Sequence, residues 1–99
     1  MKIVAVTACP TGIAHTYMAA EQLEKTGREL GHEVKVETQG AMGIENELTA
    51  AEIAAAELVI LAVDIEIEQR ERFDGKRIIE VPAQLAIKDP KSSYARLDG

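Results

Sequence analysis

Cysteine, aromatic residues and long apolar runs are scarce in this sequence, which has one Cys, two Tyr, one Phe and no Trp among 99 residues. A single cysteine excludes an internal disulfide and any CxxC redox or zinc motif. The longest apolar run, from Leu58 to Val63, is far shorter than the ~20 residues that a membrane helix needs. The first residues enter a strand-like run without a secretory signal pattern. We therefore expect a cytoplasmic protein that does not insert into a membrane.

Basic residues are also in deficit, with 11 Lys and Arg against 17 Asp and Glu and a net charge of −6. This balance argues against nucleic acid as a partner, because nucleic-acid binding needs a basic face. Residues 45–74 hold nine of the acids and two Arg, and we expect them to form a solvated face, part of which meets a basic partner. An apolar content of 46% is enough for one hydrophobic core, so residues 1–99 are expected to be a single domain.

Four segments have strand patterns. Residues 2–8 (KIVAVTA) and 58–63 (LVILAV) are continuously apolar and predict central parallel strands. Residues 33–38 alternate apolar with polar, which is typical of an edge strand, and residues 77–81 predict a fourth strand.

Helical patterns lie between the strands. Over residues 13–30, six residues recur at steps of three and four, which places them on one face of a helix. Gly31 is a plausible stop for this helix. That predicted face consists of Ile13, Tyr17, Ala20, Leu23, Gly27 and Leu30. Thr49 and Glu52 form a capping box that opens a short Ala-rich helix. A helical turn over 64–72 and a helix over 82–88 follow, residues 39–48 are expected to be a loop, and Pro90 is expected to end the helix before a polar tail or linker start at 91–99.

This alternation predicts an α/β fold with three αβα layers. The expected four-stranded parallel sheet has the order 2-1-3-4, with helices on both faces. Ligands bind such sheets at the carboxyl ends of the strands, where the order reverses. The segment that begins at Cys9 lies at that point.

The segment after the first strand combines a thiol with a helix start. The first N–H groups of a helix lack intrahelical partners and lie at its positive end, so they stabilise a thiolate or a phosphate. The candidate catalytic residue is Cys9, and the candidate phosphoryl-binding loop comprises Pro10, Thr11, Gly12, Ile13, Ala14, His15 and Thr16. The alternative is that Cys9 is an inert packing residue.

The spacing from Cys9 to His15 and Thr16 is C-x5-H-T. Cysteine-dependent phosphatases use C-x5-R, in which the Arg fork binds two phosphoryl oxygens. A histidine lacks that fixed charge near neutral pH, so the loop suits a phosphoryl carrier better than a hydrolase. A small cysteine phosphatase or arsenate reductase-like enzyme, and a module that only binds a phosphometabolite, remain alternatives.

The block ACPTGIAHT closely resembles the IIB component of the fructose-type sugar phosphotransferase system, and ETQGAMGIEN over 37–46 is also typical of that family. The resemblance covers roughly residues 2–90. It implies a phosphocysteine relay in which Cys9 accepts a phosphoryl group from a phosphohistidine on the IIA component. It also implies delivery to fructose or a similar sugar bound by the membrane IIC component. No metal or nucleotide cofactor is expected, since the nucleotide-binding glycine motifs are absent.

Other residues allow two interpretations each. His15 either contacts the phosphoryl group and tunes the thiolate or faces solvent. Residues 39–43 either border the site or only shape a turn. Asp64 is a helix cap rather than a general acid in the favoured interpretation, because a carboxylate would repel a phosphorylated cysteine. Larger apolar side chains either pack in the core or contact a partner around the site; these are Tyr17, Met18, Phe73, Ile13 and Met42.

Overall fold

Strands and helices alternate along the chain, and the computed structural model describes residues 1–8, 13–40 and 43–95. The strands are β1 (Lys2–Ala8), β2 (Glu33–Gly40), β3 (Gly43–Glu45), β4 (Leu58–Val63) and β5 (Ile78–Val81). The helices are α1 (Ile13–Glu29), α2 (Ala50–Ala55), the 3₁₀ helix η1 (Arg70–Phe73), α3 (Ala83–Lys88) and α4 (Pro90–Ala95).

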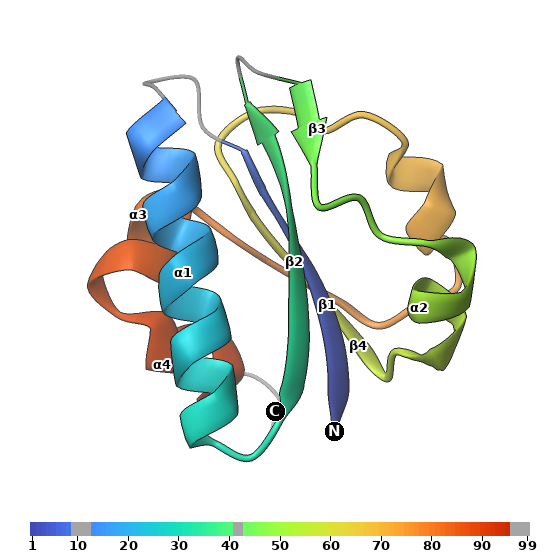
Figure 1. The fold of residues 1–99 in the computed structure, drawn as a ribbon, viewed down its shortest axis with the longest axis horizontal. Coiled ribbons are helices and arrows are strands. Elements are labelled where there is room, and N and C mark those ends of the chain that lie inside the picture. The colour runs from blue at the N-terminus through green and yellow to red at the C-terminus, as the bar shows by residue number, and fades with distance from the viewer. Residues whose placement is uncertain (9–12, 41–42, 96–99) are drawn as a thin grey trace.

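The described strands form one sheet in the order β3-β2-β1-β4-β5. The pairs β1–β2, β1–β4 and β4–β5 are parallel, so the predicted α/β class and the predicted order of the four parallel strands are confirmed. Figure 1 shows α1, α3 and α4 on one face and α2 with η1 on the other.

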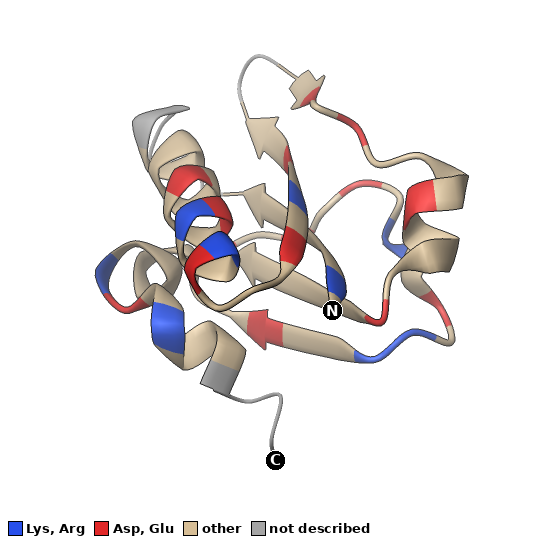
Figure 2. Ribbon diagram, turned by 60° about the horizontal axis from the view of Figure 1, so that its bottom comes forward, with Lys and Arg blue, Asp and Glu red and all other residues tan. Residues whose placement is uncertain are grey.

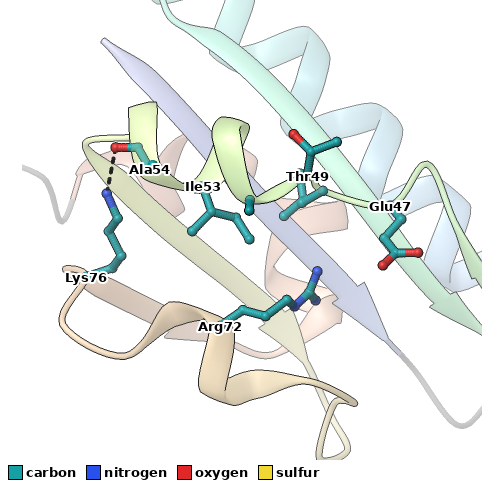
Figure 3. A pocket seen from close by; sticks show the side chains of 8 residues that line it. Glu47, Thr49, Ile53, Ala54, Arg72 and Lys76 are labelled. Carbon is teal, nitrogen blue, oxygen red and sulfur yellow. Dashed lines mark hydrogen bonds between the residues drawn. The ribbon is translucent and has the colours of Figure 1, made fainter.

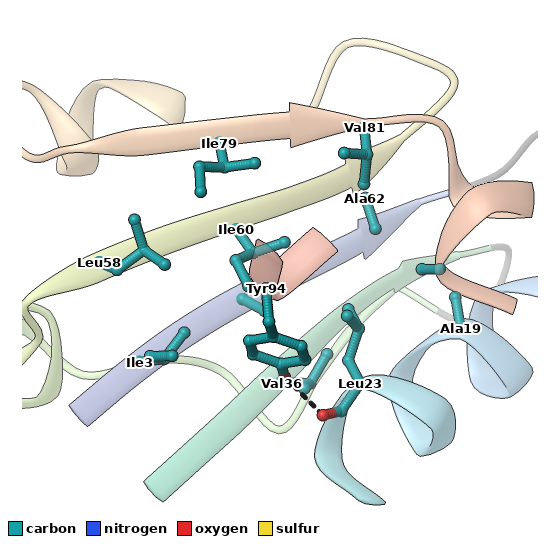
Figure 4. Packing of buried hydrophobic residues seen from close by; sticks show 12 residues of the cluster. Ile3, Ala19, Leu23, Val36, Leu58, Ile60, Ala62, Ile79, Val81 and Tyr94 are labelled. Carbon is teal, nitrogen blue, oxygen red and sulfur yellow. Dashed lines mark hydrogen bonds between the residues drawn. The ribbon is translucent and has the colours of Figure 1, made fainter. Parts of the chain in front are cut away.

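The central strands are apolar on both sides because both faces of the sheet are covered. Along β1, Ile3 and Ala5 contribute to the cluster beneath α1, whereas Val4 and Val6 belong to the cluster beneath α2 and η1. Figure 4 shows the first of these clusters, in which Leu23 of α1 reaches the sheet. Consecutive residues of a strand point to opposite faces of the sheet, so neighbouring side chains of β1 pack into different clusters.

Helix α1 buries a stripe that is offset from the predicted one. Tyr17 and Leu30, both assigned to the buried face, are 39% and 46% exposed. Among residues 15–29 of α1, those that are buried are Thr16, Ala19, Leu23, Thr26 and Gly27. Small residues replace large ones along this stripe because the helix lies close to the sheet: a Cβ on Gly27 would lie 2.3 Å from Val34 Cγ2.

The predicted loop over 39–48 contains an additional strand. β3 pairs antiparallel with β2, and its register places Gly43 opposite Gly40 and Ile44 opposite Gln39. The second parallel strand is therefore covered by β3 at its carboxyl end instead of lying at the edge, and it extends two residues beyond the predicted range. Pairing satisfies backbone groups that an exposed edge would leave open.

Two predictions near the carboxyl end of the chain are wrong in part. The helical turn expected over 64–72 is confined to η1, and residues 64–69 form a loop. Pro90 begins α4 where a tail was expected, because proline suits the first turn of a helix. Tyr94 of α4 is buried, and its hydroxyl donates to Leu23 O over 2.5 Å, so this segment is part of the core.

The sequence signals predicted for the start of α2 and the end of α1 are confirmed. Thr49 Oγ1 accepts a hydrogen bond from Glu52 N over 3.1 Å, and Thr49 N donates to Glu52 Oε1 over 2.9 Å, which completes the capping box of α2. Gly31 follows α1 with φ +85°, a left-handed conformation that favours glycine.

Candidate functional site

The site predicted from the sequence lies at the carboxyl ends of β1 and its neighbours. β1 has β2 on one side and β4 on the other, and the helices that follow β1 and β2 cover opposite faces, so the strand order reverses here. The chain leaves β1 at Ala8 and enters α1 at Ile13. Cys9, Pro10, Thr11 and Gly12 lie outside the described residues, as does Met42.

Thr16 is a member of the predicted loop whose side chain is buried. It lies in the first turn of α1, is 2% exposed, and its Oγ1 has no hydrogen-bond partner among the described residues. Its backbone oxygen accepts a 3.0 Å hydrogen bond from Thr7 Oγ1 at the end of β1. A buried hydroxyl without a partner is costly, and such a group in a native protein calls for an explanation, such as a ligand or a water molecule.

The end of β2 lies close to this hydroxyl. A Cβ built on Gly40 would lie 3.9 Å from Thr16 Oγ1, so the β2 end and the first turn of α1 flank the same region. His15 is exposed in that turn, and Ile13 and Ala14 lie in α1. The first N–H groups of this 17-residue helix lack intrahelical acceptors, and the helix begins four residues after Cys9 in the sequence.

Asp64 follows β4 on the other side of β1. Its N–H donates to Ala8 O over 3.0 Å, and its Oδ1 accepts from Ala83 N over 3.2 Å at the start of α3. The side chain therefore acts as a cap, as favoured from the sequence, although the helix that it caps is α3 and not the turn that follows it.

A buried ion pair lies on the α2 face of β2. Glu37 is fully buried, and its two carboxylate oxygens accept hydrogen bonds of 3.0 and 2.9 Å from the guanidinium of Arg72. Gln39 Nε2 (2.8 Å) and Leu48 N (2.9 Å) complete its shell. Burial acts to raise the pKa of Glu37, but the hydrogen bonds from Arg72, Gln39 and Leu48 outweigh it, and the net pKa is lowered.

Sequence reasoning missed this ion pair. Glu37 and Arg72 are 35 positions apart, and no periodicity connects them. The available signal was the two-residue spacing of Glu37 and Gln39, which places two polar side chains on one face of a strand.

Tyr17 connects α1 to the end of β3. Its hydroxyl donates to the carboxylate of Glu45, and this hydrogen bond raises the pKa of Tyr17. Tyr17 and Met18 are exposed beside the site, whereas Phe73 is fully buried in the core beneath α2 and η1.

Comparison with known proteins decides the family. The family described as "PTS system, Lactose/Cellobiose specific IIB subunit" matches residues 4–96. The "PTS system fructose-like EIIB component 2" of Escherichia coli (strain K12) is 54% identical over 97 residues, which are 98% of this chain and 92% of that protein. The chain belongs to the fructose-type IIB family of the sugar phosphotransferase system.

Solved IIB structures share the fold. A domain of the fructose-specific IIABC component of Borrelia burgdorferi is 49% identical with a TM-score of 0.90, covering 95% of this chain and 89% of that one. The IIB subunit from Escherichia coli K12 is 45% identical with a TM-score of 0.91, covering 98% and 90%. In the "PTS system fructose-specific EIIABC component" of Bacillus subtilis, the match (54% identity, 91% of this chain) spans 14% of a longer protein.

A cavity of about 640 Å³ on this IIB chain lies away from the predicted site. It opens between α2 and η1, and Figure 3 shows Ile53 and Arg72 at its wall. Lys76 also lines it, but Lys76 Nζ donates to Ala54 O and Ala56 O over 3.1 and 2.9 Å. Both cations are thus engaged within the protein.

Two further features bear on what this IIB chain can bind. No helix within residues 1–8, 13–40 and 43–95 is long and apolar enough to cross a membrane. In the same part of the chain, no three His, Cys, Asp or Glu side chains are grouped so that they could hold a metal ion.

Proposed function

We propose that this chain is a phosphocysteine carrier. Cys9 accepts a phosphoryl group from a phosphohistidine on the IIA component and passes it to fructose or a fructose-like sugar bound by the membrane IIC component. The chain would thus act as the IIB part of a protein-phosphohistidine–sugar phosphotransferase, at the cytoplasmic face of the membrane. It needs neither a metal nor a nucleotide for this transfer.

The observation that carries the proposal is the unpartnered hydroxyl of Thr16. It is buried in the first turn of α1, next to N–H groups that have no intrahelical acceptor, and one short segment separates it from the end of β1. A phosphoryl group on Cys9 would offer acceptor oxygens to both kinds of donor. A hydroxyl and backbone N–H groups, without a metal, are a sufficient set for an anion at a helix start.

The charge around this end of the sheet favours a carrier over a hydrolase. Residues 3–24, 36–69 and 78–87, which supply the carboxyl ends of β1, β2, β4 and β5 and the starts of α1 and α3, contain no Lys or Arg. In Figure 2 the first turns of α1 likewise carry no charged residue. A site without the Arg fork of cysteine phosphatases lacks the fixed charge that stabilises the transition state of hydrolysis.

The transfer consists of two balanced displacements. The thiolate of Cys9 attacks the phosphorus of phosphohistidine, the P–S bond forms and the P–N bond breaks. The imidazole leaves as a neutral ring when its second nitrogen carries a proton. A sugar hydroxyl oxygen then attacks the phosphorus, the P–S bond breaks and sulfur leaves as a thiolate, while the hydroxyl proton passes to a base or to water. In both steps the first N–H groups of α1 and Thr16 Oγ1 hold the equatorial oxygens.

The names of longer relatives support the two protein partners. The matching domain occurs in proteins named as fructose-specific EIIABC and fructose-like EIIBC components. These names place the B part in one chain with A and C parts. A free-standing IIB chain would meet the same partners by diffusion.

Mass spectrometry of the phosphorylated chain tests the proposal. The purified protein is incubated with phosphoenolpyruvate, the general relay proteins and a fructose-type IIA component. We expect the mass of one phosphoryl group to be added and fragmentation to place it on Cys9. The variant Cys9→Ser should remain unlabelled, and Thr16→Val should load more slowly.

Three results would contradict the proposal. One is the absence of label on the wild-type chain, and another is label that persists in Cys9→Ser. The third is steady hydrolysis of an aryl phosphate by the isolated protein, which would favour the phosphatase alternative.

A further inference from the structure

The side chain of Gln39 connects β2 to the loop that follows β4. Its Nε2 donates to Glu68 O over 3.1 Å, and its Oε1 accepts from Glu68 N over 2.8 Å. Because β1 lies between β2 and β4, this connection passes across the carboxyl end of β1. Figure 1 shows the same path: the yellow segment after β4 arches past the ends of β1 and β2 before it reaches η1.

The amide of Gln39 is itself held in one orientation. Its Nε2 donates to Glu37 Oε2 over 2.8 Å as well as to Glu68 O, and Arg72 fixes Glu37 from the other side. Both amide protons and the amide oxygen therefore have partners. Gln39 is 8% exposed, so water does not compete freely for these positions.

The loop over 64–69 is restrained at both ends and at Ile67. Asp64 bonds to Ala8 and Ala83 at one end, and the buried side chain of Ile67 packs in the core beneath α2 and η1. Directly after the Glu68 contact, Gln69 adopts φ +59°, a left-handed conformation that is unfavourable for a residue with a side chain. Such a conformation persists only where the surrounding contacts determine it.

We infer that Gln39 is a positioning residue for the phosphoryl transfer at Cys9. It holds the loop over 64–69 as a fixed wall beside the end of β1, where Cys9 follows Ala8. A fixed wall defines the path along which the donor histidine and the sugar approach the sulfur, and small displacements of such a path reduce transfer rates. This inference rests on the proposed function.

Single-turnover kinetics with the variant Gln39→Met tests the inference. Methionine keeps the length of the side chain but removes its hydrogen bonds to Glu68 and Glu37. We expect the limiting rate of phosphoryl transfer from phosphorylated IIA to fall by roughly tenfold or more. The half-saturating concentration of IIA should stay within about twofold, because Gln39 is 8% exposed and offers little surface to a partner. Amide hydrogen exchange at Glu68 should become faster.

The matched control is Glu68→Ala. Glu68 contributes only backbone atoms to the contact with Gln39, so its side chain can be removed without breaking the contact. We expect the amide exchange at position 68 to match that of the wild type and the transfer rate to fall much less than in Gln39→Met, because the backbone contact with Gln39 persists. If Gln39→Met does not fold, Gln39→Asn decides, since it keeps a polar amide that is too short to reach Glu68.

The outcomes separate this inference from the proposed function. A wild-type chain that takes no phosphoryl group on Cys9 overturns both. Phosphorylation of Cys9 with an unchanged rate in the Gln39 variants overturns only the positioning role. A rate that falls equally in Glu68→Ala, or a change confined to the half-saturating concentration, also overturns it.

Discussion

Removing Arg72 tests how strongly the buried carboxylate of Glu37 depends on one counterion. The variant Arg72→Met keeps an unbranched apolar side chain and removes the guanidinium, whose Cζ lies over the ring of Phe73 at 4.9 Å from the ring centre. Glu37 is 0% exposed, and it would keep only the hydrogen bonds from Gln39 and Leu48. Breaking a buried pair from one side typically costs about 3–5 kcal/mol. This is a large fraction of the about 5–15 kcal/mol by which a domain of this size is stable.

The predicted loss depends on pH. In the wild type the pKa of Glu37 is lowered, so this carboxylate stabilises the fold above the pKa that it has in the unfolded chain, and the contribution is lost as the pH falls through the folded value. In Arg72→Met burial is no longer outweighed by the guanidinium, and we expect the pKa of Glu37 to rise. The folded variant then takes up a proton on mild acidification, so its deficit should be largest near neutral pH and should shrink toward about pH 5.

Urea unfolding followed by circular dichroism at several pH values measures this effect. The double variant Glu37→Gln with Arg72→Met is the matched control, because it has no buried charge and should recover part of the loss. Two results would refute the reasoning: a destabilisation of Arg72→Met below about 1 kcal/mol, or a deficit that is the same at pH 5 and at pH 7.5.

Three further substitutions have clear expected outcomes. Gly27→Ala places a Cβ 2.3 Å from Val34 Cγ2 and should cost about 1–3 kcal/mol in thermal or urea unfolding; an unchanged stability would show that α1 can move away from the sheet. Gln69→Gly relieves a left-handed conformation and should raise stability by up to about 1 kcal/mol, whereas a loss would mean that the side chain matters more than the backbone. Asp64→Ala removes the cap of α3 and should cost about 1 kcal/mol while phosphoryl uptake by Cys9 persists; abolished uptake in a folded variant would restore the general-acid interpretation.

Signals contained in short stretches of sequence predicted most of the fold. The apolar runs that became β1 and β4 indicate burial on both sides, and this alone places them at the centre of the sheet. The capping box at Thr49 and Glu52 fixes the start of α2 without reference to any other element. The strand order then follows from the connections, since few arrangements of right-handed crossovers bury both runs.

Features that depend on distant partners were not predictable in this way. β3 is a strand because β2 lies beside it, and its three residues have no strand pattern of their own. Tyr94 is buried where its hydroxyl donates a hydrogen bond to Leu23 O, 71 positions away in the sequence. The buried stripe of α1 was misplaced because the close approach of helix and sheet favours small residues over the large apolar ones that were expected.

The candidate site also combines features that short stretches of sequence predict with features that depend on distant residues. Its position and the hydroxyl of Thr16 were expected, because a strand end followed by a helix start is a local pattern. Gln39 was considered only as part of residues 39–43, which were expected either to border the site or to shape a turn. Its contact with the Glu68 backbone joins a strand and a loop that are 29 positions apart, so no local pattern predicts it. The role of Cys9 stays a prediction.

The two faces of the sheet are stabilised by different interactions, and this difference bears on the site. The 17-residue α1, with α3 and α4, covers one face through an apolar cluster. On the other face α2 and η1 have six and four residues, and the hydrogen bonds of Arg72, Glu37 and Gln39 supplement a smaller helical cover. Hydrogen bonds to charged groups contribute about 1.5–3 kcal/mol each but depend on exact partners. Substitutions beneath α1 should therefore act through overall stability, whereas substitutions in the polar network should also move the loop beside the end of β1.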